Sequence, residues 1–209
     1  IDFDAAVGGS NALGLVTIVS GGTVDTDAAF KSAGLDWTAT TEIQLDGLVT
    51  STGTVDLSAA LIDVNAGITA AGQLVNLDAG ATGLTVDGGA ITTTGGANAA
   101  GGAIDIDSSG GGVTINSNLV TSGGTSTGVG RAGGAVNIDV NGGTGTIVFG
   151  TGADITTTGS AAAAGGNQDG GAGGLVTLNT NDALITLNDT EIDTTGGAKD
   201  GTGNQGAGG

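Results

Sequence analysis

Three short motifs, each alternating an apolar residue with a polar one, recur in a fixed order along the chain. The first occurs at residues 55–57, 75–77, 104–106, 136–138 and 176–178, the second at 62–64, 84–86, 113–115, 147–149 and 185–187, and the third at 68–69, 91–94, 119–121, 155–158 and 192–195. Alternation with a period of two, rich in β-branched residues and bounded by Gly, Asn, Asp and Ser, predicts short half-buried strands joined by turns.

One set of three motifs fits between residues 54 and 72, a length that three short strands and their corners use up. We therefore predict an all-β fold, a single-stranded, three-sided parallel β-helix (β-solenoid). Its coils stack at about 4.8 Å, so about seven coils would extend over roughly 35 Å. The general preference for right-handed crossovers favours a right-handed coil. One coil cannot bury its own apolar face, so stacking is obligatory.

The repeat predicts one domain over residues 1–209, regular from 42 to 209 and less regular from 1 to 41. In the N-terminal part, residues 37–39, 42–46 and 48–51 fit the three motifs in order. Ile1-Asp2-Phe3-Asp4, read as a first motif, would open one more coil with residues 15–18 and 23–25. Phe3 would then share a strand file with Trp37, both pointing inward, and Phe149 would point inward from a second motif.

Composition limits both the core and the function. The 209 residues include 46 Gly, 3 Phe and 1 Trp but no Pro, Cys, Met, His or Tyr, which predicts a narrow core without disulfides or thiolate metal sites. The chain has 21 acidic and 3 basic residues, a net charge of −18. This charge disfavours binding to nucleic acid and attracts divalent cations. No apolar run approaches the roughly 20 residues that span a bilayer, so membrane insertion is not expected.

The third motif at 91–94 and each later third motif precede a glycine-rich connection. These connections lie at residues 95–102, 123–134, 159–174 and 196–209, and they lengthen along the chain. Three interpretations are open. They are tolerated surface loops, since loop closure costs little per added residue; or a fringe that binds a ligand such as a carbohydrate at one corner of the solenoid; or glycine-rich surfaces that let neighbouring solenoids pack closely.

Acidic side chains recur on the outward positions of the first motif. Asp78, Asp105, Asp107 and Asp139 would form a ladder of carboxylates spaced by one coil, which a bridging Ca²⁺ would relieve. A solvated polar face is the alternative, and neither an EF-hand loop nor a Gly-Gly-x-Gly-x-Asp array is present. No other cofactor is expected. At the end of the second motif stand Asn65, Asp87, Asn116 and Asn188, side chains that tolerate a left-handed corner and can hydrogen-bond along a ladder.

The runs 91–96, 101–106 and 112–116, with their Thr-Thr-Gly-Gly and Gly-Gly-Ala-Ile-Asp-Ile patterns, are similar to repeats of filamentous-haemagglutinin-like bacterial adhesins and autotransporter-type passenger regions. The resemblance covers residues 42–209 well and the first 41 loosely. It implies a β-helix, bacterial-type secretion, a place outside the cell or at its surface, and a structural or adhesive role with a cell-surface or matrix ligand. It brings no catalytic residues.

The ends of the chain suggest self-association. A Gly pair such as Gly208-Gly209 precedes a first motif elsewhere, and Ile1–Asp4 was matched above to that motif, so we expect head-to-tail stacking or a longer repeat chain. Ice binding is a remote alternative, because the outward threonines at 92, 94, 156 and 158 are interrupted by Val120, Ser122 and Asp193. An enzyme is not expected, since the chain lacks His and Cys for acid–base or nucleophilic work.

Overall fold

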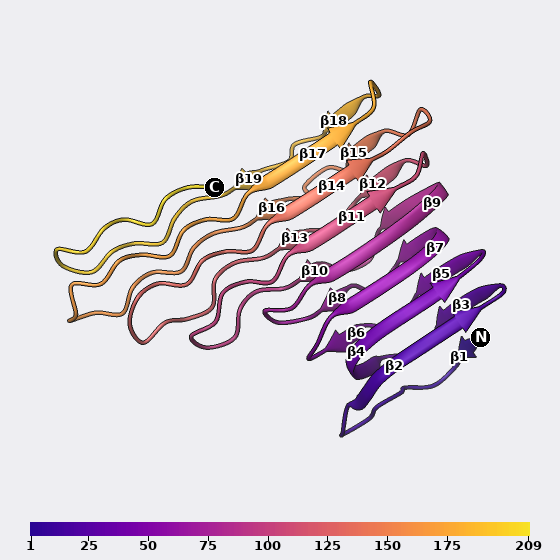
Figure 1. Cartoon of the computed structure of the whole chain (residues 1–209), viewed down its shortest axis with the longest axis horizontal. Helices are drawn as coiled ribbons and strands as arrows, with labels where there is room; N and C mark the ends of the chain where they lie inside the picture. Colours follow the sequence, from indigo (N-terminus) through magenta and orange to yellow (C-terminus); the bar gives the residue numbers. More distant parts are fainter.

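The computed structural model describes residues 1–209 and is all-β, with 19 strands and no helix. Every strand pairing is parallel, and the strands join into one sheet that curls around the chain's apolar side chains, as in a β-solenoid (Figure 1). The pairings fall into three ladders, which the chain visits in turn. This matches the predicted all-β, parallel, solenoid-like class and, from residue 37 onward, the order of the three motifs.

The first ladder contains the first motif of every repeat. Its strands are β2 (Leu13–Ser20), β4 (Phe30–Ala39), β7 (Val55–Val64), β9 (Val75–Val86), β11 (Ile104–Ser108), β14 (Val136–Val140) and β17 (Val176–Thr180).

The second ladder contains the second motifs. Its strands are β1 (Asp2–Phe3), β3 (Thr23–Thr26), β5 (Glu42–Leu45), the later halves of β7 and β9, β12 (Val113–Ile115), β15 (Ile147–Phe149) and β18 (Ile185–Leu187). β7 and β9 belong to both the first and the second ladder. In these two strands the corner between the ladders is a register shift in their pairing, at Ala59/Leu61, instead of a loop.

The third ladder is the shortest in strand length. It joins the start of β4 to β6 (Val49–Ser51), β8 (Ile68–Thr69), β10 (Ile91–Thr92), β13 (Leu119–Val120), β16 (Ile155–Thr156) and β19 (Ile192–Asp193). The glycine-rich connections leave the solenoid after this ladder, beyond β10, β13, β16 and β19, and project as waved segments to the left in Figure 1.

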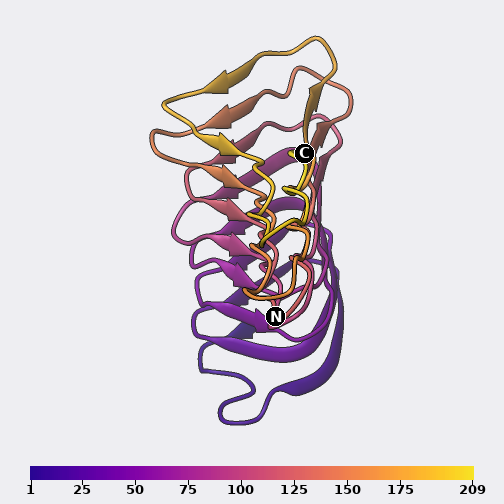
Figure 2. The ribbon, with the colours of Figure 1, turned by 90° about the vertical axis from the view of Figure 1, so that its left-hand side faces the viewer.

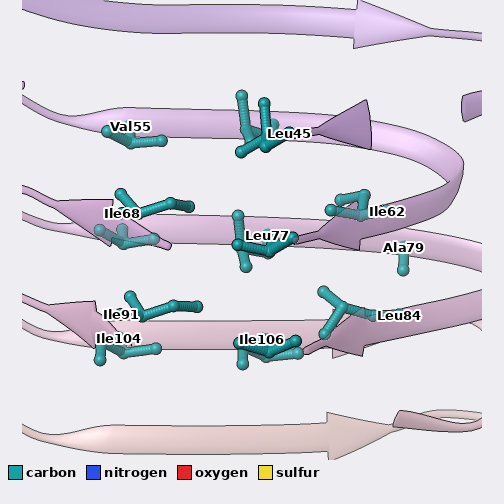
Figure 3. Packing of buried hydrophobic residues seen from close by; sticks show 14 of the residues in the cluster. Leu45, Val55, Ile62, Ile68, Leu77, Ala79, Leu84, Ile91, Ile104 and Ile106 are labelled. Carbon is teal, nitrogen blue, oxygen red and sulfur yellow. The ribbon is translucent and has the colours of Figure 1, made fainter. Parts of the chain in front are cut away.

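The core is one continuous cluster of 34 buried apolar residues. Inward residues of successive coils stack in files, such as Ile68 over Ile91 and Leu77 over Ile106 (Figure 3). The view of Figure 2 shows the coils stacked along one axis. Alternation therefore places the apolar residues as predicted, and Phe149 is fully buried among them. No helix is long and apolar enough to cross a membrane.

All three strands of the predicted first coil were assigned to the wrong ladders: residues 15–18, taken as the second motif, lie in β2 of the first ladder, and residues 23–25, taken as the third, lie in β3 of the second. Asp2 and Phe3 pair with Asp25 and Thr26, so β1 lies in the second ladder, whereas the first ladder begins with β2. Residues 1–4 alternate as either a first or a second motif would. Only their pairing partner shows which ladder they join. The match of residues 1–4 to a first motif, on which the expected end-to-end stacking partly rested, is therefore wrong.

Three aromatic side chains meet inside the first coils. Phe3, Phe30 and Trp37 come from the second, third and first ladders respectively, so Phe3 and Trp37 do not share a file as predicted. Their rings nevertheless stack, with centroids 6.0 Å apart and planes at 17°, while Phe30 meets Trp37 edge-on at 5.0 Å. These large rings fill the N-terminal part of a core whose other side chains are aliphatic apart from Phe149.

The corner residues were predicted only in part. Asn65, Asp87, Asn116 and Asn188 do not adopt positive φ; the left-handed positions in these corners are Gly67, with φ of 85°, and Asp189, with φ of 55°. The side-chain ladder does form, because the Asn65 amide donates to Asp46 at 2.8 Å and the Asn116 amide donates to Asp87.

Candidate functional site

The predicted calcium ladder lies on the outer face of the first ladder. Asp78, Asp107 and Asp139 are in register on β9, β11 and β14, and Asp105 stands in the neighbouring file between Asn76 and Asn137. Adjacent strands therefore bring three carboxylates into one file, as expected from the repeat. Carboxylate oxygens in such a row are the ligands that Ca²⁺ prefers.

Asparagine amides hydrogen-bond to several of the carboxylates on this face. Asn76 donates to Asp56 at 2.8 Å, Asn137 to Asp105 at 2.8 Å and Asn179 to Asp139 at 2.9 Å. Asp107 has carboxylates on both sides instead. Burial, followed by the charges of Asp105, Asp139 and Asp78, raises the pKa of Asp107. A bound cation at Asp78, Asp105, Asp107 and Asp139 stays a prediction.

A tighter acidic group lies elsewhere and was not foreseen. Asp2, Asp25 and Asp27 form the one group of three or more potential metal-ligand side chains whose ligand atoms all lie within 4.8 Å of one another. Burial and the charges of Asp27, Asp46 and Asp2 raise the pKa of Asp25, and one of its carboxylate oxygens is buried without a hydrogen-bond partner. The group depends on the β1–β3 register, which the local pattern of residues 1–4 did not reveal.

The surface has two depressions, and both are lined without hydrophobic side chains. One is formed by Asp78, Asp107, Ser108, Ser109 and Asn141, the other by Gly152, Asp154, Asp189, Thr190 and Glu191. Binding pockets for organic ligands are mostly apolar with a few convergent polar groups. These depressions suit water or cations better than an organic substrate.

The glycine-rich connections, here called the glycine arms (residues 95–102, 123–134, 159–174 and 196–209), form an ordered part of the structure. Each runs out from the third ladder, the first three return to the first ladder, and successive arms lie along one another (Figure 1). Of the 115 backbone hydrogen bonds, 61 involve turns, loops or strand ends, and many of these join the arms. The arms are therefore not independent loops.

Neighbouring arms pair with a spacing of three residues. Outgoing residues Gly159 and Ala162 donate to the carbonyls of Thr195 and Ala198 at 2.9 and 2.8 Å. Returning residues Gly170 and Gly173 donate in the same way to Asn204 and Ala207. A repeat of three residues in an extended chain without strand pairing is typical of polyproline II geometry.

The outgoing and returning halves are also joined to each other. Gly171 N–H donates to the Ser160 carbonyl at 2.9 Å, and Gly197 N–H donates to the Gly171 carbonyl at 2.7 Å. Such close approach requires glycine: a Cβ at Gly134 or Gly174 would overlap the carbonyl oxygen of Gly102 or Gly134, respectively. The glycines thus pack backbone against backbone within the chain, an intramolecular arrangement that was not among the three interpretations of these connections.

A pair of hydrogen bonds closes the mouth of each arm, here called the threonine clamp. Gly102 N–H donates to the Thr93 carbonyl at 2.8 Å, and the Thr93 hydroxyl donates to the Gly102 carbonyl at 2.7 Å. The same two bonds join Thr157 to Gly174. Thr93 and Thr157 are fully buried, so their hydroxyls are satisfied only by the returning glycine. The sequence signal was the Thr two residues after the Ile or Leu of the third motif.

The tips of the last two arms are also hydrogen-bonded to each other. One carboxylate oxygen of Asp200 accepts backbone N–H groups of Gly165, Gly166 and Asn167 at 2.7, 2.8 and 3.2 Å. These bonds, led by that from Gly166, lower the pKa of Asp200. One arm tip is thereby tied to the next.

Comparison with known proteins finds no relative from which a function could be transferred. No family model matches the chain, and neither a curated protein nor a solved structure matches it. The function therefore has to be argued from the solenoid, its acidic faces and the glycine arms.

Proposed function

We propose that the chain is a structural shaft segment of a secreted extracellular filament or of a large bacterial surface adhesin. In this proposal the ladders form a right-handed, three-sided solenoid of about seven coils, to which further coils add at its ends. The similarity of residues 91–116 to haemagglutinin-like adhesin repeats supports an export route and a place at the cell surface.

The observation that carries the proposal is that the solenoid and the glycine arms run along one axis and are hydrogen-bonded to each other. The apolar core is a single cluster of buried residues that reaches from Ile18 to Ile155, and the glycine arms pack beside it and are clamped to it. Because the backbone groups of the arms bond largely to one another, fewer of them are free to recognise a ligand. A structural role therefore accounts for the arms better than a ligand-binding fringe does.

The apolar edge of the last coil supports association with a further coil. Ile185, Leu187 and Ile192 are 36 %, 45 % and 40 % exposed, whereas their partners one coil earlier, Ile147, Phe149 and Ile155, are fully buried. The open side of a parallel strand also leaves backbone groups free to pair. The occupant that fits is another coil of the same kind, which continues the three ladders.

Sedimentation velocity over a range of concentrations, with negative-stain imaging, tests the proposal. The chain should form end-to-end oligomers, and Leu187→Lys should abolish them by placing a charge on the open edge. Thr186→Lys, one residue away on the outer face of β18, is the matched control and should still associate. A wild-type chain that stays monomeric at every concentration would contradict the proposal.

A further inference from the structure

Asn141 occupies a special place among the asparagines of the chain. It follows β14 at the corner between the first and second ladders, where residues 141–146 connect β14 to β15. Its side chain is exposed and lines the polar depression that contains Asp78, Asp107 and Ser109. The backbone turns left-handed directly after it, with φ of 93° at Gly142 and 62° at Gly143.

The amides of the ladder asparagines are held in hydrogen bonds, whereas that of Asn141 is not. Asn76, Asn137 and Asn179 each donate to an aspartate of the preceding coil, and Asn65 and Asn116 do the same at the next corner. The side chain of Asn141 makes no hydrogen bond. Asn141 is also the one asparagine in the sequence that is followed by glycine.

The backbone nitrogen that follows Asn141 is free as well. Gly142 N–H donates to no acceptor, while the glycines after two aspartates are engaged: Gly47 donates to the Thr26 carbonyl at 2.7 Å and Gly170 to the Asn204 carbonyl at 2.9 Å. Glycine carries no Cβ that would hinder approach to its nitrogen. An unhindered, unpaired amide therefore stands next to an unrestrained carboxamide.

We propose that Asn141-Gly142 is a site of spontaneous deamidation. The Gly142 nitrogen, having lost its proton to solvent base, attacks Cγ of Asn141; the new C–N bond closes a succinimide ring, and the side-chain nitrogen leaves as ammonia. Water then opens the ring at either carbonyl, giving aspartate or isoaspartate. The net change is the gain of one water and the loss of one ammonia, and no oxidant or reductant is needed.

The product would change the charge of the depression. An aspartate at position 141 brings a third carboxylate beside Asp78 and Asp107, where like charges repel in a part-buried setting. Isoaspartate instead lengthens the main chain by one carbon, which a corner accommodates more readily than a strand. We therefore expect the modified chain to be less stable than the original at neutral pH.

The test is incubation of the folded chain in mildly alkaline, ¹⁸O-enriched water, followed by peptide mapping with mass spectrometry. Label should enter at position 141 before any other asparagine, and faster at higher pH. The titratable groups near this corner are Asp78 of β9 and Asp107 of β11, which line the depression beside Asn141, and Asp139, two residues before it on β14.

Two controls keep the result decisive. Asn141→Gln keeps the amide and the charge but forms the cyclic intermediate much more slowly, so labelling at this position should nearly vanish while the melting temperature is unchanged. Asn137, whose amide is held by Asp105, is the internal reference. Labelling of Asn141 no faster than that of Asn137 in the folded chain would overturn the proposal.

Discussion

Thr121 and Gly134 exchange two hydrogen bonds where a glycine arm leaves and re-enters the solenoid. Gly134 N–H donates to the Thr121 carbonyl at 2.6 Å, and the Thr121 hydroxyl donates to the Gly134 carbonyl at 2.6 Å. Both residues are buried, so neither bond can be replaced by water. This clamp joins the arm to the core, and its contribution can be measured.

Replacing Thr121 by Val should destabilise the chain by about 1–3 kcal/mol, because it keeps the shape but leaves the Gly134 carbonyl without its hydroxyl donor. Urea unfolding followed by circular dichroism measures the loss. Thr92→Val is the matched control, since Val120 already occupies the same outward file. Equal losses for the two variants would show that the clamp contributes nothing.

Replacing Gly134 by Ala should cost about 1–3 kcal/mol or more, because the added Cβ overlaps the Gly102 carbonyl oxygen and forces the arms apart. Gly96→Ala serves as the control, since a Cβ there meets nothing within 4 Å. That variant should be neutral or more stable by up to about 1 kcal/mol. If both glycines tolerate alanine equally in thermal melts, the arms do not pack as described.

Asp107 and Asp200 should affect stability in opposite directions as pH changes. The pKa of Asp107 is raised above the ordinary 3.8, so the folded state binds its proton more tightly than the unfolded state, and its contribution to stability falls as pH rises from that value through the raised pKa. The pKa of Asp200 is lowered, so its contribution is present above 3.8 and is lost as pH falls through the lowered pKa.

Asp107→Asn should therefore raise the melting temperature at neutral pH and leave it unchanged at strongly acidic pH. Asp200→Asn should lower it at neutral pH, because the carboxylate that accepts three backbone N–H groups is lost. Melting curves across the acidic range measure both effects. A neutral-pH loss in Asp107→Asn would contradict the assigned repulsion.

Calcium should stabilise the chain if a cation bridges the acidic file. Addition of Ca²⁺ to chelator-treated protein should then raise the melting temperature, and Asp107→Asn should reduce that rise. Asp193→Asn, which alters an aspartate outside this face, is the control for a general effect of charge. Superimposable melts with Ca²⁺ and with chelator would remove the predicted site at Asp78, Asp105, Asp107 and Asp139.

Much of the solenoid could be predicted from the sequence, because alternation, strand length and turn residues all agree from residue 42 onward. The three motifs became the three ladders, and the file of Asp78, Asp107 and Asp139 lies in register as expected. Local alternation says which residues point inward. It does not say which strand is the neighbour, so β1 was placed in the first ladder although it pairs with β3.

The packing of the glycine arms could not be predicted from local sequence patterns, for a physical reason. Their hydrogen bonds repeat every three residues and join segments about 30–40 residues apart, so glycine-rich sequence alone resembles a flexible linker. The Asp2, Asp25 and Asp27 group likewise depends on a pairing between distant segments. Only the repeated Thr before each arm and the Gly pair after it hinted at the clamp.

Hydrogen–deuterium exchange of the backbone amides tests most directly whether the core and the glycine arms form one body. Amides that bond between arms, such as those of Gly124, Gly133 and Gly173, should be protected to nearly the same degree as strand amides of β11 and β14. Gly142, which donates to no acceptor, supplies the unprotected reference. Arm amides that exchange as fast as Gly142 while the strands stay protected would contradict the account.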